Sequence, residues 1–245
     1  MPVSGEWFSP TELRFSAIHV RAKTEWVHLS LGDGAGVVGQ GEITSVQVAS
    51  EVAPVVARLA NRLRGRRLTS DTDVLTLNNL TTGQLEDDRV LATAVSGLRC
   101  AVADALSRVL QMPMVDYLRE LHDHEGTADT KIQLYSNINR SMLDDDNGKV
   151  DRSSDAFAEM AQRAMEAGFT TAKCAPFDEC NAPFNSTGLP REAEIGLDRI
   201  RAAKAVVGPD RTLLVDCHSR FDLDSGLALE PELREAGVGW YEEPV

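Results

Sequence analysis

The stretch Thr212–Phe221 reads T-L-L-V-D-C-H-S-R-F, and it decides the fold. Its first half is a short apolar run rich in branched side chains, which is typical of a fully buried strand. Strand alternation would point Asp216 and His218 the same way and Cys217 the opposite way. In α/β enzymes, chemistry takes place at the carboxyl ends of such buried strands. The alternative interpretation is a strand that ends in solvent, with Asp216 and His218 as turn residues.

The residues on either side extend this stretch into an alternating series of strands and helices. The expected strands are Ile132–Ile138, Phe169–Ala175, Thr212–His218 and Val238–Glu243. The expected helices are Ser154–Ala167, Arg191–Val207 and Glu230–Ala236. Gly168, Gly208 and Gly237 follow these helices as stop signals. The order β-α-β-α-β-α-β indicates a parallel sheet with right-handed crossovers.

The first 125 or so residues show a different pattern. Leu13–Lys23 and Glu25–Leu31 alternate as antiparallel strands do, and a glycine-rich third strand follows. The glycines between positions 32 and 41 predict bends in that strand rather than a phosphate-binding loop. Expected helices then cover 45–63, Asp88–Leu110 and Val115–Leu121. We therefore expect an α+β unit over residues 1–125, separated from the parallel series by a polar break.

Composition limits the class of protein. The chain has 245 residues, of which 42% are hydrophobic and 26% charged, as in soluble globular proteins. The net charge of −13 argues against nucleic acid and anionic membranes as partners. The four cysteines lack C-x-x-C spacing, so we expect reduced thiols in the cytoplasm rather than a zinc site or disulfides. No targeting signal and no membrane-spanning apolar run is predicted.

Each strand of the parallel series leads into polar residues at its carboxyl end. Because such ends converge on one mouth in a barrel, Lys173, Asp216, His218 and Glu242 are expected to meet there. Two carboxylates from successive strands suit a hard cation such as Mg²⁺. A lysine beside them supplies positive charge for an anionic substrate, or acts as a base if its pKa is lowered. The structural alternative is a ring of salt bridges, but charges of both signs on consecutive strand ends favour catalysis.

Four further residues are candidates for substrate binding. Asn137, Asn139 and Arg140 end the first of these strands. They can bind substrate hydroxyls or a carboxylate, and turn roles are equally consistent with the sequence. Arg220 follows the Asp216–His218 pair as another candidate.

Three segments resemble a known family: G-F-T-T-A-K-C-A at 168–175, L-L-V-D-C-H-S-R at 213–220 and W-Y-E-E-P at 240–244. On these motifs the chain resembles the enolase superfamily, in particular its mandelate racemase-like group of acid-sugar enzymes. The resemblance implies an α+β capping domain over 1–125, followed at 131–245 by the first half of a modified TIM barrel. It also implies Asp216 and Glu242 as Mg²⁺ ligands.

Departures from the family pattern bear on the chemistry. Family racemases often carry Lys-x-Lys on the second barrel strand, with the second lysine as base, but here Lys173 is followed by Cys174 and Ala175. The resemblance therefore leaves Lys173 a charge-stabilising role. Galactonate dehydratase-like members carry Asp-x-His on the third strand and use this histidine as acid or base, a pattern that His218 fits.

The resemblance thus implies Mg²⁺-dependent dehydration of a sugar acid. A base removes the α-proton, the metal and Lys173 hold the enediolate, and His218 protonates the departing β-hydroxyl. One alternative is a racemase, epimerase or cycloisomerase that shares the enediolate step. Another alternative is a non-catalytic remnant or interaction module. The expected partner is a small sugar acid, and the full-length form is expected to be a homo-oligomer.

The stretch 131–245 supplies about half of the roughly 200–250 residues that a (β/α)₈ barrel takes. The third metal ligand of the family, on strand five, and its distal His-Asp pair have no counterpart in the sequence. We expect the chain to be a fragment of a longer gene product. The alternative is a half-barrel whose open edge is covered by another chain.

Overall fold

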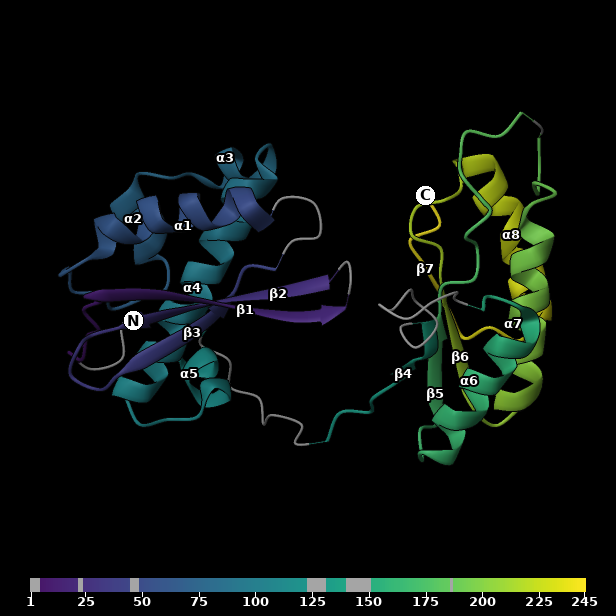
Figure 1. Ribbon diagram of the computed structural model, residues 1–245, viewed down its shortest axis with the longest axis horizontal. Coiled ribbons are helices and arrows are strands. Elements are labelled where there is room, and N and C mark those ends of the chain that lie inside the picture. The colour runs from purple at the N-terminus through teal and green to yellow at the C-terminus, as the bar shows by residue number, and fades with distance from the viewer. Residues whose placement is uncertain (1–4, 22–23, 45–48, 123–130, 140–150, 186) are drawn as a thin grey trace. The chain divides into compact units, whose positions relative to one another are not determined.

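The computed structural model describes residues 5–21, 24–44, 49–122, 131–139, 151–185 and 187–245 (Figure 1). The chain forms two compact units, Met1–Asp129 and Thr130–Val245. Each unit has its own cluster of buried apolar side chains.

The first unit is α+β, as the sequence predicts. Its antiparallel sheet has the order β1-β2-β3, with strands β1 (Glu12–Arg21), β2 (Thr24–Gly32) and β3 (Val38–Glu42). Its helices are α1 (Ala49–Leu63), α2 (Asp73–Asn78), α3 (Thr82–Glu86), α4 (Arg89–Val109) and α5 (Met114–Leu121). The sequence does not predict α2 and α3, because five or six residues are too few to show an apolar period.

Helix α4 packs directly against β3 through glycines. A Cβ atom placed on Gly39 would lie 1.9 Å from the Ala101 carbonyl oxygen. One placed on Gly41 would lie 2.1 Å from the Gly97 carbonyl oxygen. The expectation that these glycines bend the strand is therefore wrong for Gly39 and Gly41, which instead let a helix backbone approach the sheet.

Among the described helices, α4 alone is long and apolar enough by composition to cross a membrane. Its residues Leu98, Val102 and Leu106 are buried in the core of the first unit. This is the burial expected of a helix in the core of a folded unit.

The second unit has a parallel sheet of order β4-β5-β6-β7, which confirms the predicted alternating series. Its strands are β4 (Ser136–Asn137), β5 (Thr171–Cys174), β6 (Thr212–Asp216) and β7 (Trp240–Glu242). Its helices are α6 (Ser154–Glu166), α7 (Ala193–Val207) and α8 (Leu223–Glu235). Within this unit, Figure 1 shows the three helices on one side of the sheet.

The strands are shorter than predicted. Strand β4 has only two residues, and Ile132 and Leu134 before it are exposed rather than buried. Strand β6 ends at Asp216 because His218 and Ser219 adopt positive φ values of 50° and 52°, which no strand accommodates.

Helix α8 begins seven residues earlier than predicted. A capping box between Asp222 and Ser225 starts it. Gly226 and Pro231 lie inside the helix, and both residue types argue against a helix when only the sequence is considered. Burial of Leu229 and Leu233 against the sheet supplies the stabilisation that local propensity lacks.

The cysteines of the strand ends point into the apolar layer, as predicted. Cys174 and Cys217 are each 1% exposed and lie in the second unit's core. Burial raises the pKa of the Cys174 thiol to about 12 and that of Cys217 further, so both stay protonated. The orientation of Cys217 that strand alternation predicts, opposite to Asp216, is confirmed.

Candidate active site

The strand register brings polar residues of neighbouring strands together. Asn137 of β4 pairs with Lys173 of β5, and Asp216 of β6 pairs with Glu242 of β7. The parallel pairing also continues past the strands, since the Cys217 backbone N–H donates to the Glu242 carbonyl oxygen at 2.9 Å. Backbone hydrogen bonds therefore fix the two carboxylate-bearing segments side by side.

Lys173 bridges the two carboxylates. Its Nζ lies 3.0 Å from Asp216 Oδ2 and 2.5 Å from Glu242 Oε1. Burial by itself lowers the pKa of Lys173, but hydrogen bonds and charge from Glu242 and Asp216 outweigh it and hold the pKa above its ordinary value. Lys173 is therefore an ammonium at neutral pH, suited to holding negative charge rather than to removing a proton.

His218 stands beside the buried carboxylate. Its backbone N–H donates to Asp216 Oδ1 at 3.1 Å, and its Nε2 lies 3.4 Å from Asp216 Oδ2. The imidazole side chain is 52% exposed, so a ligand can reach it. The positive φ at His218 turns the chain out of the strand while keeping the side chain next to Asp216, and such backbone strain is common at functional sites.

A pocket of about 170 Å³ opens at these strand ends. It is lined by Asn137, Asn139, Lys173, Cys174, Ala175, Asp216 and His218. Two larger hollows, of about 400 and 430 Å³, lie around β1 in the first unit. The ionisable side chains shared by both larger hollows, Glu12 and Arg14, pair with each other. We place the candidate site at the smaller pocket because an ammonium, a carboxylate and an imidazole, those of Lys173, Asp216 and His218, converge there.

The two remaining predicted site residues, Arg140 and Arg220, are not seen in the pocket. Arg220 does not line the pocket, and its Nη1 donates to the Asp178 and Cys180 carbonyl oxygens at 3.0 Å each. Its predicted contact with substrate stays a prediction. Arg140 lies outside the described residues.

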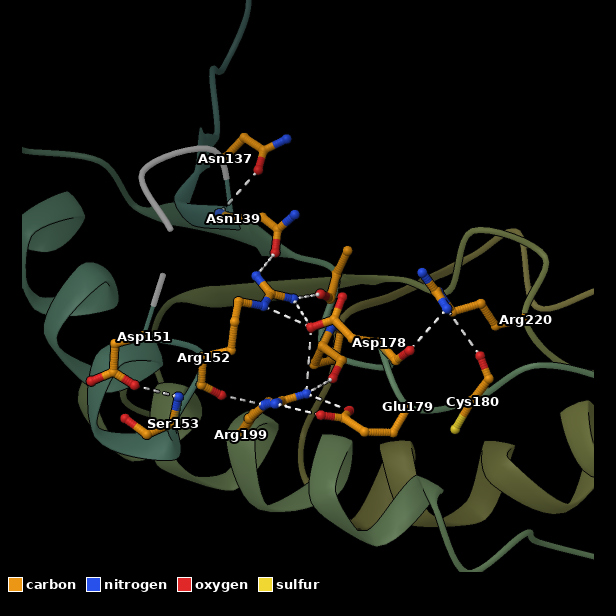
Figure 2. Close-up of polar contacts among 12 residues, drawn as sticks. Asn137, Asn139, Asp151, Arg152, Ser153, Asp178, Glu179, Cys180, Arg199 and Arg220 are labelled. Carbon is orange, nitrogen blue, oxygen red and sulfur yellow. Dashed lines mark hydrogen bonds and ion pairs between the residues drawn. The ribbon is translucent and has the colours of Figure 1, made fainter. Parts of the chain in front are cut away.

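An arginine pair beside the pocket was not singled out from the sequence (Figure 2). Arg152 donates to Asn139 Oδ1, to Asp178 Oδ2 at 2.6 Å and to the Ala175 carbonyl oxygen at 2.7 Å. Arg199 donates from Nε to the Arg152 carbonyl oxygen at 2.6 Å. The two residues of each contact lie 13 to 47 positions apart in the chain, so no local sequence motif predicts them.

Arg199 also binds residues of the loop after β5. Its two Nη atoms contact the two carboxylate oxygens of Glu179 at 2.7 and 2.8 Å, the bidentate geometry that arginine favours. Burial alone raises the pKa of Glu179, but the hydrogen bonds and charge of Arg199 outweigh it and hold the pKa below its usual value. The segment from Ala175 to Cys180 is therefore held to helices α6 and α7 by charged contacts.

The two carboxylates have the chemistry that a divalent cation binds. Asp216 and Glu242 offer hard oxygen donors that already share one positive charge, that of Lys173. Mg²⁺ is usually bound by one or two protein carboxylates and keeps several waters. Among the residues that the structure describes, no group of three or more His, Cys, Asp or Glu side chains is arranged to hold a metal ion, at these strand ends or elsewhere.

Two family models match the chain. The mandelate racemase / muconate lactonizing enzyme N-terminal domain matches residues 7–118, and the enolase C-terminal domain-like model matches residues 156–245. The chain thus belongs to the enolase superfamily, and the resemblance seen in its motifs is confirmed. Members of this superfamily generally use Mg²⁺. A search of curated proteins found no match.

Solved structures share the fold at low identity. A member of the enolase superfamily from Salmonella Typhimurium matches with a TM-score of 0.79 and 19% identity, over 97% of this chain and 62% of that one. A "putative dehydratase" from Mesorhizobium loti matches with 0.78 and 18%, over 97% and 60%. A mandelate racemase/muconate lactonizing enzyme from Bordetella bronchiseptica RB50 matches with 0.72 and 19%, over 98% and 60%.

The chain therefore spans about 60% of the length of these solved structures. Over that span the fold is the predicted one: an α+β capping domain followed by the first part of an enolase-type barrel.

Proposed function

We propose that this chain is part of a Mg²⁺-dependent lyase that dehydrates a sugar acid. In this proposal the active enzyme also contains the remaining strands of the barrel. The observation that carries the proposal is that Lys173 Nζ lies 3.0 Å from Asp216 Oδ2 and 2.5 Å from Glu242 Oε1, with His218 beside Asp216. Two solved structures of the same fold are described as dehydratases, and this supports dehydration as the reaction.

Asp216 and Glu242 would hold the cation. When bound, Mg²⁺ supplies positive charge that polarises the carboxylate of a substrate and makes its α-proton more acidic. The chain's own part is to keep the two carboxylate-bearing segments adjacent, which the strand register and backbone hydrogen bonds do.

Lys173 and His218 take different parts because their environments differ. Lys173 is almost fully buried and remains protonated, so it stabilises negative charge on substrate oxygens rather than removing the α-proton. His218 presents an exposed imidazole, and an imidazole can carry a proton near neutral pH. In this proposal His218 protonates the departing β-hydroxyl as a general acid.

The proposal is tested in a protein that carries this chain and the remaining barrel strands. A library of sugar acids is screened for 2-keto-3-deoxy products, while deuterium exchange at the α-carbon is followed in the same samples. We expect keto product from wild type, none from Asp216→Asn, and α-exchange without product from His218→Asn. Arg201→Gln, on the exposed face of α7, serves as the control.

Two results would reject the proposal. Exchange without keto product from wild type would assign a racemase or epimerase instead. Wild-type product formation by His218→Asn would remove this residue from the reaction.

The proposed setting of the reaction is the cytoplasm, with a small-molecule substrate and a homo-oligomeric full-length enzyme. The four cysteines are free thiols, which is consistent with a reducing compartment. Sedimentation of the extended protein measures its oligomeric state, and a monomer at working concentration would contradict this part of the proposal.

A further inference from the structure

Two asparagines on the β4 side of the pocket have their amide oxygens occupied from within the protein. Asn139 Oδ1 accepts a hydrogen bond from the Arg152 guanidinium. Asn137 Oδ1 accepts one from the Asn139 backbone N–H at 3.1 Å. Both side chains line the pocket. Figure 2 shows both amide nitrogens directed away from these internal contacts.

The orientation of the Asn139 amide follows from the chemistry of its partner. A guanidinium has donors and no acceptor, so the amide must turn its oxygen toward Arg152. A backbone N–H imposes the same orientation on Asn137. The NH₂ ends of both amides are therefore the ends left for other partners, and an NH₂ group only donates.

Arg152 is itself held firmly enough to impose this orientation. Its Nε donates to Asp178 Oδ2 at 2.6 Å, and its Nη2 donates to the Ala175 carbonyl oxygen at 2.7 Å. Its guanidinium also lies over the Phe157 ring, 4.8 Å from the centroid. With its side chain only 17% exposed, Arg152 acts as a fixed donor rather than a mobile surface charge.

Lys173 adds a third donor beside these amides. It pairs with Asn137 in the strand register, and an ammonium group can only donate hydrogen bonds. Asp216, on the next strand, gives that side of the pocket carboxylate acceptors. The pocket is thus divided into a donor side, formed by β4 and β5, and an acceptor side, formed by β6.

We infer that Arg152 is a positioning residue that fixes Asn139 as a hydrogen-bond donor, so that the β4 side of the pocket binds acceptor oxygens of a polyhydroxy acid. This inference rests on the proposed function and names which ligand atoms the β4 side receives. Arg152 acts through Asn139 and does not itself line the pocket.

Asn139→Asp gives the sharpest test. An aspartate has the same shape and still accepts from Arg152, so the internal contact is retained, but an oxygen replaces the NH₂ end. Titration calorimetry of the 245-residue chain with D-glycerate, in a buffer containing Mg²⁺, should show affinity about tenfold lower or more for this variant, with unchanged thermal stability. Equal affinity for wild type and variant would overturn the inference, as would no measurable binding by wild type.

Two probes distinguish the ligand atom. Lactate lacks the β-hydroxyl of glycerate and keeps the carboxylate. A penalty from Asn139→Asp that appears with glycerate and disappears with lactate places the hydroxyl at Asn139. An equal penalty with both ligands places there a group that both carry, the carboxylate or the α-hydroxyl.

Arg152→Met separates positioning from a merely structural role. Without its donor, the Asn139 amide can turn over and accept from the NH₂ group of glyceramide. The preference for glycerate over glyceramide should therefore fall about tenfold relative to wild type. A loss that weakens both ligands by the same factor would mean that Arg152 only stabilises the fold.

These measurements are separate from the test of the reaction. The expected affinity losses in Asn139→Asp and Arg152→Met could appear in a protein that performs no dehydration. That result would reject the proposed reaction and would still support Asn139 as a hydrogen-bond donor.

Discussion

The two units of the chain are tightly packed by opposite means. Against β3, helix α4 approaches because Gly39, Gly41 and Gly97 have no side chains. At the carboxyl ends of the parallel strands, contacts depend on long charged side chains, with Arg152 and Arg199 bound to carboxylates and carbonyl oxygens. The first arrangement is intolerant of added atoms, whereas the second is intolerant of lost charge partners. The second arrangement borders the pocket that Lys173, Asp216 and His218 line.

The largest expected effect is that of Gly41→Ala in the first unit. The added Cβ would lie 2.1 Å from the Gly97 carbonyl oxygen, so α4 and β3 would have to separate. We expect the free energy of unfolding to fall by about 3 kcal/mol or more, the upper end for overpacked sites. Urea denaturation measures the change.

Gly83→Ala is the matched control. Nothing lies within 4 Å of a Cβ at Gly83, which is inside helix α3. Alanine there should stabilise by up to about 1 kcal/mol. Similar losses from both glycine variants would show that close packing is not what Gly41 serves.

In the second unit, Arg199→Met should cost about 3 kcal/mol. The substitution leaves Glu179 and two carbonyl oxygens without their donor. We place the cost at the low end for broken buried pairs because a third of the Glu179 side chain is exposed. Denaturant unfolding again measures it.

Arg201→Met tests whether burial is the cause. Arg201 lies on the same helix and pairs with Glu194 and Asp198, but all three side chains are exposed. Its removal should cost less than about 1 kcal/mol. If the two arginine variants lost the same stability, the distinction between buried and exposed pairs would not hold.

A smaller effect is expected from alkaline pH through the buried thiols. Burial raises the pKa of Cys174 to about 12 and of Cys180 to about 11, whereas an unfolded thiol ionises near 9.0. Above pH 9.0 the unfolded chain loses these protons and the folded chain keeps them, so stability falls as pH rises. Each buried thiol should contribute about 1 kcal/mol over the first pH unit.

Cysteine variants show how much each thiol contributes to the loss of stability at alkaline pH. Cys174→Ala should reduce the alkaline loss between about pH 9 and about pH 10. Cys100→Ala should leave it unchanged, because Cys100 is exposed. An alkaline loss that is the same in all three proteins would assign it to other groups.

The smallest expected effect is that of Tyr241→Phe. The Tyr241 hydroxyl donates to the Gly226 carbonyl oxygen at 2.9 Å and ties β7 to α8. Its loss should lower stability by about 1 kcal/mol, the usual value for one hydrogen bond. Calorimetric melting measures the change, and an unaltered melting temperature would show that the bond adds nothing.

The sequence predicted which side chains meet at the strand ends better than it predicted the lengths of the elements. Alternation within strands and the convergence of parallel strand ends were enough to expect Lys173, Asp216 and Glu242 to meet. Those rules follow from backbone geometry and hold wherever the strands pair. The ends of β4 and β6 were not predictable, because they depend on pairing partners and on the positive φ at His218.

The arginine network could not be predicted for a different reason. Arg152 precedes the N-cap of α6, and its partners come from β4 and the loop after β5. Such contacts form only after the fold has brought distant segments together. Local propensity failed in the same way at α8, where Pro231 lies inside the helix.

The central claim is that Asp216 and Glu242 form a divalent-cation site at the carboxyl edge of the parallel sheet. Electron paramagnetic resonance with Mn²⁺ in place of Mg²⁺ tests it on the 245-residue chain. We predict weak binding by wild type, since two carboxylates are the protein ligands present. Asp216→Asn should lower the affinity at least about tenfold, while Asp198→Asn, an exposed carboxylate on α7, should not. Mn²⁺ binding by Asp216→Asn with wild-type affinity would contradict the account.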